Sequence, residues 1–230
     1  MKIDRGQNLL RVKEKIAKAA ERVGRNADEI TLLAVSKVFT VDDIKSVYDL
    51  GLRYFGESRA QELRDKVPQL AEDIHWHFIG PLQSNKIKYV VPNAELIHAV
   101  DSLKLAIEIA NYGKSNGVKP AILIEVNTSG EKEKHGFVPG HALDAVLEIN
   151  TLENLEVKGL MTMAAYTENT YQIGKSFSML NKLYEKIGEH IGHSQFKELS
   201  MGMSGDFEIA IEEGSTIVRI GTGIFGPRRR

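Results

Sequence analysis

The stretch TLLAVSKVF, residues 31–39, is the part of the chain from which the fold can be inferred first. Four consecutive apolar residues, Leu32 to Val35, are too few for a helix, and Ser36 and Lys37 follow at once. Such a run is typical of a strand that is covered on both faces, as in a parallel sheet. A lysine at its end lies at the mouth of the fold, where partial desolvation can favour the neutral, nucleophilic amine. The alternative is a strand-end lysine whose ammonium group extends into solvent.

The same alternation of strand and helix patterns recurs along the whole chain. Short apolar or alternating segments predict eight strands, at residues 32–36, 52–55, 75–79, 96–100, 121–126, 157–163, 199–203 and 216–220. Helical periodicity predicts an opening helix and seven helices between the strands, at residues 5–23, 41–50, 57–70, 82–90, 101–116, 139–149, 170–191 and 206–213.

This order of elements predicts the architecture. Alternating strands and helices indicate a parallel sheet, and eight units in 230 residues favour a single closed (β/α)8 barrel with an extra N-terminal helix. An open doubly wound sheet is the alternative, but it usually carries a Gly-x-Gly-x-x-Gly turn after its first strand, and this chain has Ser36-Lys37-Val38 there. No linker or change of composition divides the chain, so residues 1–230 are expected to form one domain.

Composition narrows the classes of function. The formal net charge is −1, so no overall positive field attracts nucleic acid or a membrane surface. The chain has no cysteine, which excludes disulfides, thiolate metal sites and cysteine nucleophiles. No apolar signal segment or membrane-spanning run occurs, and we expect a cytoplasmic protein. The only basic cluster, residues 228–230, is expected to be a solvated tail, with phosphate binding as the alternative.

In a barrel, the carboxyl ends of all strands meet at one mouth, and that mouth holds the active site. The loops at 200–205 and 221–223 combine glycines with hydroxyl side chains, a composition that can expose backbone N–H groups to a phosphate. They follow the seventh and eighth predicted strands, where barrels favour phosphate sites. The alternative is that these glycines only serve tight turns. The residues that we expect at the site are Lys37, Ser58, His77, Met163, Ser200, Met203, Ser204, Arg219, Gly221 and Thr222.

A lysine and a phosphate cradle together indicate a phosphorylated aldehyde held as an imine, either pyridoxal 5′-phosphate or a phosphosugar. Arg219 stands two residues before Gly221, between the lysine and the phosphate loop. A guanidinium that faces the pyridine nitrogen would keep this nitrogen unprotonated and make the cofactor a weak electron sink. The alternative is an ion pair of Arg219 with an acidic residue of the preceding helix, Asp206, Glu208 or Glu212.

Two further features of the third predicted strand have simpler interpretations. Trp76 is expected to pack in the core or at an interface. His75 and His77 share one face of the strand, as metal ligands can, but no third ligand is evident and no metal site is expected.

Longer motifs carry a resemblance to a known family. They are LLAVSK (32–37), YFGE (54–57), WHFIGPLQSNK (76–86), VNTSGE (126–131), GLMTM (159–163) and the segment 199–228. With these motifs the chain resembles the pyridoxal phosphate homeostasis proteins, the YggS/PROSC family, whose fold is similar to the N-terminal barrel of alanine racemase. The resemblance implies pyridoxal 5′-phosphate on Lys37, Arg219 at the pyridine nitrogen, and a phosphate site formed by Ser200, Ser204, Gly221 and Thr222. Lys134 matches a lysine proposed in the family as a secondary acceptor of the cofactor.

The chain departs from the family pattern at three places. Ser58 stands where the family usually has asparagine, so the contact of that residue with the cofactor ring is in doubt. Gly223 replaces a common alanine, which should be a mild change. The tail at 228–230 is all arginine, and arginine cannot form an imine as the tail lysines of some members can.

The sequence favours a carrier over an enzyme. A racemase needs two bases, one on each face of the cofactor. No tyrosine at a predicted strand end offers the second base, which leaves His77, Lys134 and His135 as candidates. We therefore expect a non-catalytic protein, a monomer or weak dimer, that binds pyridoxal phosphate and related B6 vitamers and supplies apo-enzymes. The alternatives are a racemase of weak or narrow activity and an aldolase that forms a Lys37 imine with a phosphosugar.

Overall fold

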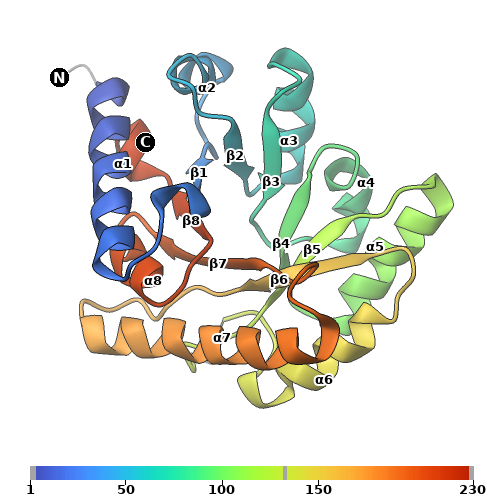
Figure 1. Ribbon diagram of the computed structural model, residues 1–230. Coiled ribbons are helices and arrows are strands. Elements are labelled where there is room, and N and C mark those ends of the chain that lie inside the picture. Colours follow the sequence, from blue (N-terminus) through green and yellow to red (C-terminus); the bar gives the residue numbers. More distant parts are fainter. Residues whose placement is uncertain (1–3, 132–133, 228–230) are drawn as a thin grey trace.

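The structure is a computed structural model that describes residues 4–131 and 134–227. Its eight strands are all parallel and close into a barrel in sequence order, with the last strand paired to the first (Figure 1). The closed barrel that the sequence predicts is confirmed, and the open doubly wound sheet is excluded. The strands are β1 (Thr31–Val35), β2 (Tyr54–Glu57), β3 (His75–Phe78), β4 (Leu96–Val100), β5 (Ala121–Glu125), β6 (Glu156–Met161), β7 (Glu198–Met203) and β8 (Ile217–Ile220).

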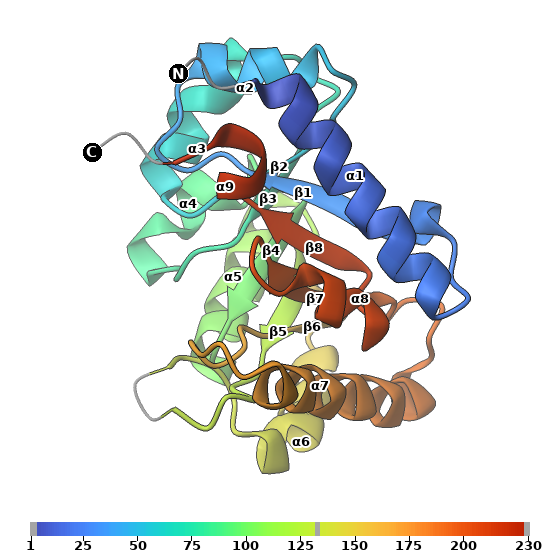
Figure 2. The same ribbon diagram turned by 90° about the vertical axis from the view of Figure 1, so that its left-hand side faces the viewer.

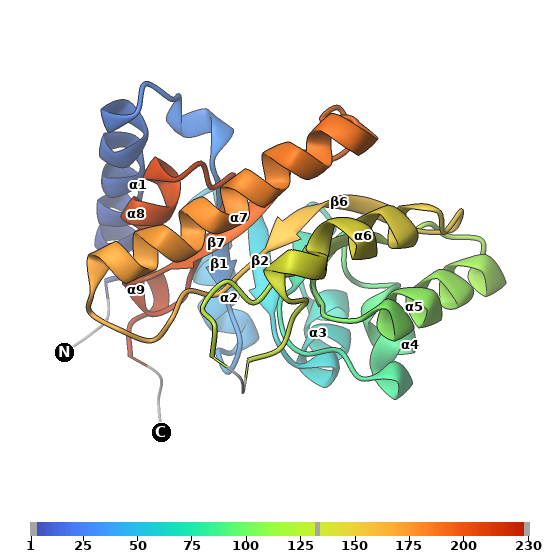
Figure 3. The same cartoon turned by 90° about the horizontal axis from the view of Figure 1, so that it is seen from below.

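Helices follow the strands and cover the outside of the barrel, and α7 lies between α8 and α6 when the molecule is seen from below (Figure 3). None of the helices in the described ranges is long and apolar enough to cross a membrane. The helices are α1 (Arg5–Arg22), α2 (Val41–Tyr48), α3 (Ala60–Lys66), α4 (Ile87–Val90), α5 (Leu103–Asn116), α6 (Pro139–Asn150), α7 (Thr170–Ile191), α8 (Phe207–Glu212) and α9 (Thr222–Phe225).

The alternation of side chains along each strand divides the core into two parts. Every second strand residue points outward and joins a continuous apolar layer between the barrel and its helices. The inward residues form a smaller cluster that fills the barrel, with Leu33, Leu96, Leu123 and Ile217 among its members. In β1 this alternation directs Leu33 and Val35 inward, and the same parity reaches Lys37 just beyond the strand.

The extra N-terminal helix is confirmed, and it covers the last part of the chain (Figure 2). Asp4 caps its first turn by accepting a hydrogen bond from the Gln7 N–H. Its buried face packs against α8 and α9, and the Asn8 side chain donates a hydrogen bond to the carbonyl of Ile224. Helix α1 therefore packs against the segment that follows β8 and holds it in place.

Two local differences from the sequence prediction concern the site. Strand β2 spans Tyr54–Glu57 instead of 52–55, and the helix after it spans Ala60–Lys66 instead of 57–70. Gly56 lies within the strand and does not end it. It faces the filled interior, where an added Cβ would approach the Leu33 side chain to 3.1 Å, so a glycine fits this position. Helix α9 was not predicted because four residues are too few to show helical periodicity. The other strand boundaries differ by at most two residues.

Candidate functional site

Lys37 lies in a tight turn directly after β1. The Phe39 N–H donates to the carbonyl of Ser36, which closes the turn around Lys37 and Val38. Val38 has a φ of 66°. A β-branched residue in this left-handed region costs roughly 1–3 kcal/mol, so the surrounding structure must hold it there. The strain lies next to the lysine that the sequence singles out.

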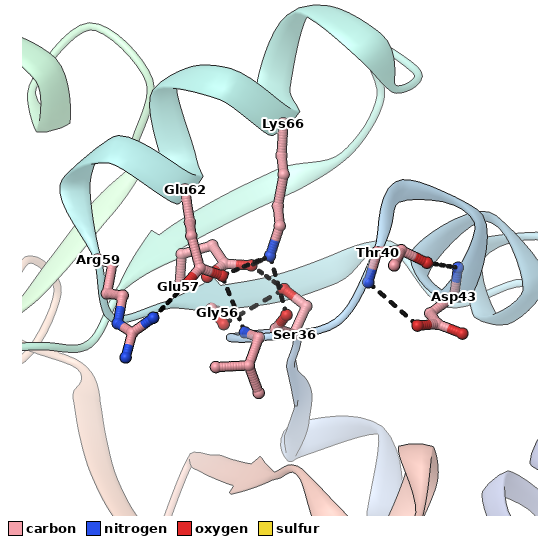
Figure 4. A network of polar contacts seen from close by, with 9 residues as sticks. Ser36, Thr40, Asp43, Gly56, Glu57, Arg59, Glu62 and Lys66 are labelled. Atoms are coloured by element: carbon pink, nitrogen blue, oxygen red, sulfur yellow. Dashed lines mark hydrogen bonds and ion pairs between the residues drawn. The ribbon is translucent and has the colours of Figure 1, made fainter. Parts of the chain in front are cut away.

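A buried network between α3, β2 and the end of β1 holds this turn (Figure 4). The Lys66 ammonium, from α3, donates to the Ser36 carbonyl at 3.1 Å, to Glu57 Oε1 at 2.7 Å and to Glu62 Oε2 at 2.8 Å. The Ser36 hydroxyl donates to the same Glu57 oxygen at 2.7 Å. Lys66 is 8% exposed and Glu57 is fully buried. One of these three ammonium hydrogen bonds thus holds the backbone just before Lys37, and the other two hold the carboxylates beside it.

The backbone after Lys37 is held by two further contacts. Glu62 accepts a hydrogen bond from the Val38 N–H at 2.8 Å, which fixes the strained residue (Figure 4). The Phe39 ring stacks on Phe225 of α9, with ring centroids 4.6 Å apart. The turn is therefore anchored on both sides of Lys37, to α3 on one side and to the segment after β8 on the other.

The two carboxylates of this network have opposite pKa shifts. Burial raises the pKa of Glu57, although Lys66 and Ser36 act against the rise. Burial would also raise the pKa of Glu62, but its bonds from Lys66 and the Val38 N–H outweigh this and lower its pKa below the ordinary value. The second oxygen of Glu57, Oε2, is buried without a hydrogen-bond partner among the described residues. Glu57 therefore depends on Lys66 for its charge.

Closure of the barrel places the last strand beside this turn. Ala34 is in register with Ile220, so Gly221 follows β8 where Val35 ends β1. A Cβ added at Gly221 would lie 3.5 Å from the Cβ of Val35. The loop at 221–223 is thus a direct neighbour of the Lys37 turn, although the two are far apart in the sequence.

The glycines of the two predicted phosphate loops fall into two kinds. Gly202 has a φ of 91°, and an added Cβ would approach the Cβ of Ala210 to 2.5 Å, so the fold itself requires this glycine. Gly205 and Gly221 have no such φ, and an added Cβ would meet open space or an ordinary contact. The tight-turn interpretation therefore accounts for Gly202 but not for Gly205 or Gly221.

The two loops are joined, because the Gly223 N–H donates to the Ser204 hydroxyl at 3.3 Å. Thr222 is exposed and begins α9, in which the Ile224 N–H donates to the Gly221 carbonyl. Small side chains and the hydroxyls of Ser204 and Thr222 together suit a phosphate group. Ser204, Gly221 and Thr222 are thus brought together at one end of the barrel.

Arg219 points into the barrel from β8 and is 5% exposed. Its Nη1 donates to the Ser200 hydroxyl at 2.6 Å, and its Nη2 donates to the Thr162 carbonyl at 2.9 Å. No carboxylate among the described residues forms an ion pair with it. Glu208 instead pairs with Lys15 and Arg22 of α1, and Glu212 pairs with Arg22. The ion-pair alternative of the sequence analysis is therefore not what the structure shows.

The charge of Arg219 is retained at neutral pH. Burial lowers the pKa of Arg219 to about 10, and the more distant carboxylates of Asp206 and Glu125 act against this fall. Burial also raises the pKa of Glu125, with Asp101 adding to the rise, while Arg219 and His135 oppose it. Arg219 is thus a buried cation without a direct anionic partner in the described structure.

His77 is not brought to the mouth with the other predicted residues. Its Nδ1 is 2.9 Å from Nε2 of His98 inside the barrel. Its ring lines a cavity of about 480 Å³ at the opposite end, where the strands begin, together with Tyr54, Leu96 and Ile217. Ser200 lies deeper than the phosphate loops, and its hydroxyl stands between Arg219 and His98.

The remaining predicted residues lie at or near the mouth. Met203 ends β7 and is 40% exposed, and Met163 follows β6 and is 39% exposed. Ser58 follows β2, and its carbonyl would be 2.2 Å from a Cβ at Gly80, so its backbone packs tightly on that turn. The predicted tail at 228–230 lies outside the described residues.

The Lys134 amine is already engaged by its own loop and the next one. It donates to the Ala164 carbonyl at 2.7 Å and pairs with Glu131 at 3.0 Å. Nearby, His135 pairs with Asp101 at 3.2 Å. Lys134 would have to leave both contacts before its amine could take up an aldehyde.

The described part of the chain holds no group of three histidine, aspartate or glutamate side chains that could bind a metal ion. His75, the partner of His77 in the metal hypothesis, stacks on Tyr54 and contacts Glu95. Trp76 is 5% exposed and packs against Phe55, which confirms its expected role in the core.

Sequence reasoning missed the residues that hold Lys37 and Arg219 in place, namely Glu57, Glu62, Lys66 and His98. His98 left the clearest signal, since it is the one polar residue of the strand LIHAV. Glu57 is likewise a charged residue within a strand. Polar residues in the middle of buried strands are costly unless they are paired, and this rule could have marked both.

Comparisons with known proteins identify the family of the chain. Residues 8–229 match the family model of the alanine racemase N-terminal domain. A pyridoxal phosphate homeostasis protein from Aquifex aeolicus is 42% identical over 97% of this chain and 98% of its own length. One from Escherichia coli K12 is 38% identical over 98% of this chain and 97% of its own length.

Solved structures show the same relationship. A protein from Bifidobacterium adolescentis, described as unknown, has a TM-score of 0.91 at 39% identity over 97% of both chains. PipY of Synechococcus elongatus, with pyridoxal phosphate bound, has a TM-score of 0.80 at 30% identity, over 92% of this chain and 100% of its own. An alanine racemase from Clostridium difficile, at 19% identity and a TM-score of 0.73, shares the fold over 55% of its length. The chain therefore belongs to the alanine racemase N-terminal domain family and, within it, to the pyridoxal phosphate homeostasis proteins.

Proposed function

We propose that this protein binds pyridoxal 5′-phosphate at the carboxyl end of its barrel, with the Lys37 amine as the point of covalent attachment. Arg219 would face the pyridine nitrogen, and Ser204, Gly221 and Thr222 would hold the phosphate. The observation that carries the proposal is the adjacency of the Lys37 turn and the joined loops after β7 and β8. PipY, which is 30% identical, was solved with pyridoxal phosphate bound and supports the choice of ligand.

The residues present fit this cofactor at both of its ends. Open space over Gly205, beside the Ser204 hydroxyl, suits a phosphate. Arg219 supplies a buried positive charge that forms no ion pair with a carboxylate in residues 4–131 and 134–227. When bound, the cofactor supplies an aldehyde that can join a primary amine reversibly and withdraw electrons from it. A permanently charged guanidinium near the ring nitrogen disfavours protonation there and so limits that withdrawal.

We further propose that the protein carries the cofactor and supplies apo-enzymes in the cytoplasm, and does not itself catalyse turnover. A racemase needs a second base opposite Lys37. Of the three candidates, the His77 ring is bonded to His98 away from the mouth, and the Lys134 amine is held by Ala164 and Glu131. His135 pairs with Asp101. These engagements support a site that holds and releases a ligand.

Reconstitution of the purified protein with pyridoxal phosphate tests the proposal. We expect a visible absorption band that borohydride abolishes, and mass spectrometry should then find the reduced adduct on Lys37. Lys37→Ala should lose the band and the adduct, whereas Lys18→Ala, at an exposed position of α1, should keep both. A wild-type protein that cannot be reconstituted would refute cofactor binding. Steady racemisation of an amino acid at about 1 per second or faster would refute the carrier role.

A further inference from the structure

A chain of hydrogen bonds crosses the barrel interior below the mouth. Arg219 Nη1 is 2.6 Å from the Ser200 hydroxyl, this hydroxyl is 2.9 Å from Nδ1 of His98, and Nε2 of His98 is 2.9 Å from Nδ1 of His77. The four side chains come from β8, β7, β4 and β3. All four are at most 5% exposed, so water does not compete with these bonds.

The donors and acceptors of this chain can run in only one direction without leaving a buried group unpaired. A guanidinium has donors and no acceptor, so the Ser200 oxygen accepts from Arg219. The hydroxyl proton of Ser200 then needs an acceptor, and among the described residues Nδ1 of His98 is the one within reach. His98 is therefore protonated on Nε2 and donates to Nδ1 of His77. His77 in turn carries its proton on Nε2, at the cavity where the strands begin.

The reverse direction would have His98 donate from Nδ1 to Ser200. The serine oxygen would then accept twice, and its own proton would have no partner in a fully buried position. An unpaired buried donor is unfavourable, so the single direction set by Arg219 is the stable one. Both histidines are then neutral, in agreement with burial lowering the pKa of His77 to about 3 and the pKa of His98 well below its ordinary value.

We propose that His98 and His77 are positioning residues that fix the orientation of Arg219 through Ser200. The guanidinium is held at Nη1 by this neutral chain and at Nη2 by the Thr162 carbonyl. The orientation of the guanidinium is thus fixed by uncharged acceptors, which do not neutralise its charge, so this charge can act on a ligand. A direct carboxylate partner would fix the guanidinium equally well but would cancel much of that charge. The inference rests on the proposed function, in which Arg219 faces the cofactor ring.

The direction of the hydrogen bonds from Arg219 to His77 can be tested without any cofactor. Nitrogen-15 NMR of histidine in the full-length apo-protein at pH 7 should show His77 and His98 as neutral rings protonated on Nε2. The variants Ser200→Ala and His98→Asn assign the signals, since each changes one neighbour in the chain. A His98 ring protonated on Nδ1, or a charged ring, would overturn the proposed direction. This result does not depend on whether the protein binds pyridoxal phosphate.

Titration with pyridoxal phosphate then tests the positioning role. His98→Leu should weaken equilibrium binding about tenfold and shift the absorption maximum of the bound cofactor, because Arg219 loses an oriented acceptor. His98→Asn retains an acceptor for the Ser200 hydroxyl and should recover most of both properties. His141→Leu, an exposed position of α6, is the matched control and should change neither. Thermal unfolding of each apo-variant separates a folding defect from a binding defect.

The outcomes separate the two proposals. A wild-type protein that binds pyridoxal phosphate, with a His98→Leu variant of equal affinity and identical spectrum, would overturn the positioning role and leave the proposed function standing. A wild-type protein that binds no pyridoxal phosphate would overturn the proposed function and the positioning role, whereas the direction of the chain would still be decided by NMR. If His98→Leu does not fold, the comparison of Ser200→Ala with His98→Asn takes its place, and equal binding by these two variants would overturn the positioning role.

Discussion

Lys37 and Arg219 are held in opposite ways. The Lys37 turn is fixed through its backbone, by a charged network on the outer face of the barrel that contains Lys66 and two carboxylates. Arg219 is fixed through its own side chain, by neutral acceptors in the interior. The difference follows from what each group must do in the proposed function. Lys37 must attach and release a ligand from a turn whose backbone stays in place, whereas Arg219 must keep its charge and its orientation.

Substitutions in the charged network of Lys66 and in the neutral hydrogen-bond chain of Arg219 should have different consequences. Loss of one partner of a buried ion pair leaves an uncompensated charge, which is costly. Loss of one member of a neutral chain leaves an unpaired dipole, which costs less. Damage to the charged network should therefore appear mainly as a loss of stability, and damage to the neutral chain mainly as a change in ligand binding.

The largest expected effect is on the charged network. Lys66→Met should lower the free energy of unfolding by about 3–5 kcal/mol, because Glu57 stays buried without its cation. The double variant Glu57→Met/Lys66→Met should recover most of this stability, since it removes the buried charge as well. Chemical denaturation of the apo-proteins measures both values. Equal stability of the single and double variants would show that the pair does not act as a unit.

The two buried, neutral histidines, His77 and His98, should make the stability of the protein depend on pH. Burial lowers the folded-state pKa of His77 and His98 below their unfolded value near 6.5, so below that pH the unfolded chain binds protons that the folded chain does not. The free energy of unfolding should therefore fall as the pH falls from 7 to 5, by up to about 1.4 kcal/mol per pH unit for each histidine. For His77 this dependence continues down to about pH 3.

Denaturation midpoints at several pH values check this sign. Buried carboxylates with raised pKa values, such as Glu57 and Glu125, act in the opposite sense, so the comparison is made against a variant. The double variant His77→Asn/His98→Asn should show a shallower decline than the wild type between pH 7 and 5. Identical slopes in the two proteins would mean that these histidines are not neutral in the folded state.

The smallest expected effect concerns the strained residue of the Lys37 turn. Val38→Gly removes the side chain that makes a φ of 66° unfavourable, and Val38 is 46% exposed, so little packing is lost. We expect the free energy of unfolding to rise by about 1 kcal/mol or to stay unchanged, with faster release of pyridoxal phosphate from the less rigid turn. Denaturation and the decay of the visible band measure the two quantities. A clear loss of stability would show that the left-handed turn is not strained.

The parts of the site that could be predicted are those that follow strand ends. Lys37, Ser204, Gly221 and Thr222 were expected at one mouth because parallel strands end at the same edge of a barrel, and the structure does bring them there. His77 follows the same rule by sequence but lies at the other end. The rule counts residues along a strand, and it does not give the depth of a side chain within the barrel.

The residues that could not be predicted are those whose partners are distant in sequence. By sequence, Lys66 looks like an ordinary charged residue on the solvent-exposed face of a helix. Only the structure shows that its ammonium donates to the Ser36 carbonyl. His98 and Ser200 are 102 residues apart and meet because β4 and β7 both face the interior. Contacts of this kind depend on the closure and register of the barrel, which no local pattern encodes.

The sequence by itself determined the barrel, its extra helix and the lysine after the first strand, because hydrophobic periodicity and strand ends are local properties of the chain. Only the tertiary structure decided how that lysine and Arg219 are held. It placed the Lys66–Glu57 ion pair against the Lys37 turn, and it gave Arg219 neutral hydrogen-bond acceptors in the barrel interior. The physical reason is that hydrogen-bond partners and desolvation are set by which strands become neighbours, and both appear only when the barrel closes.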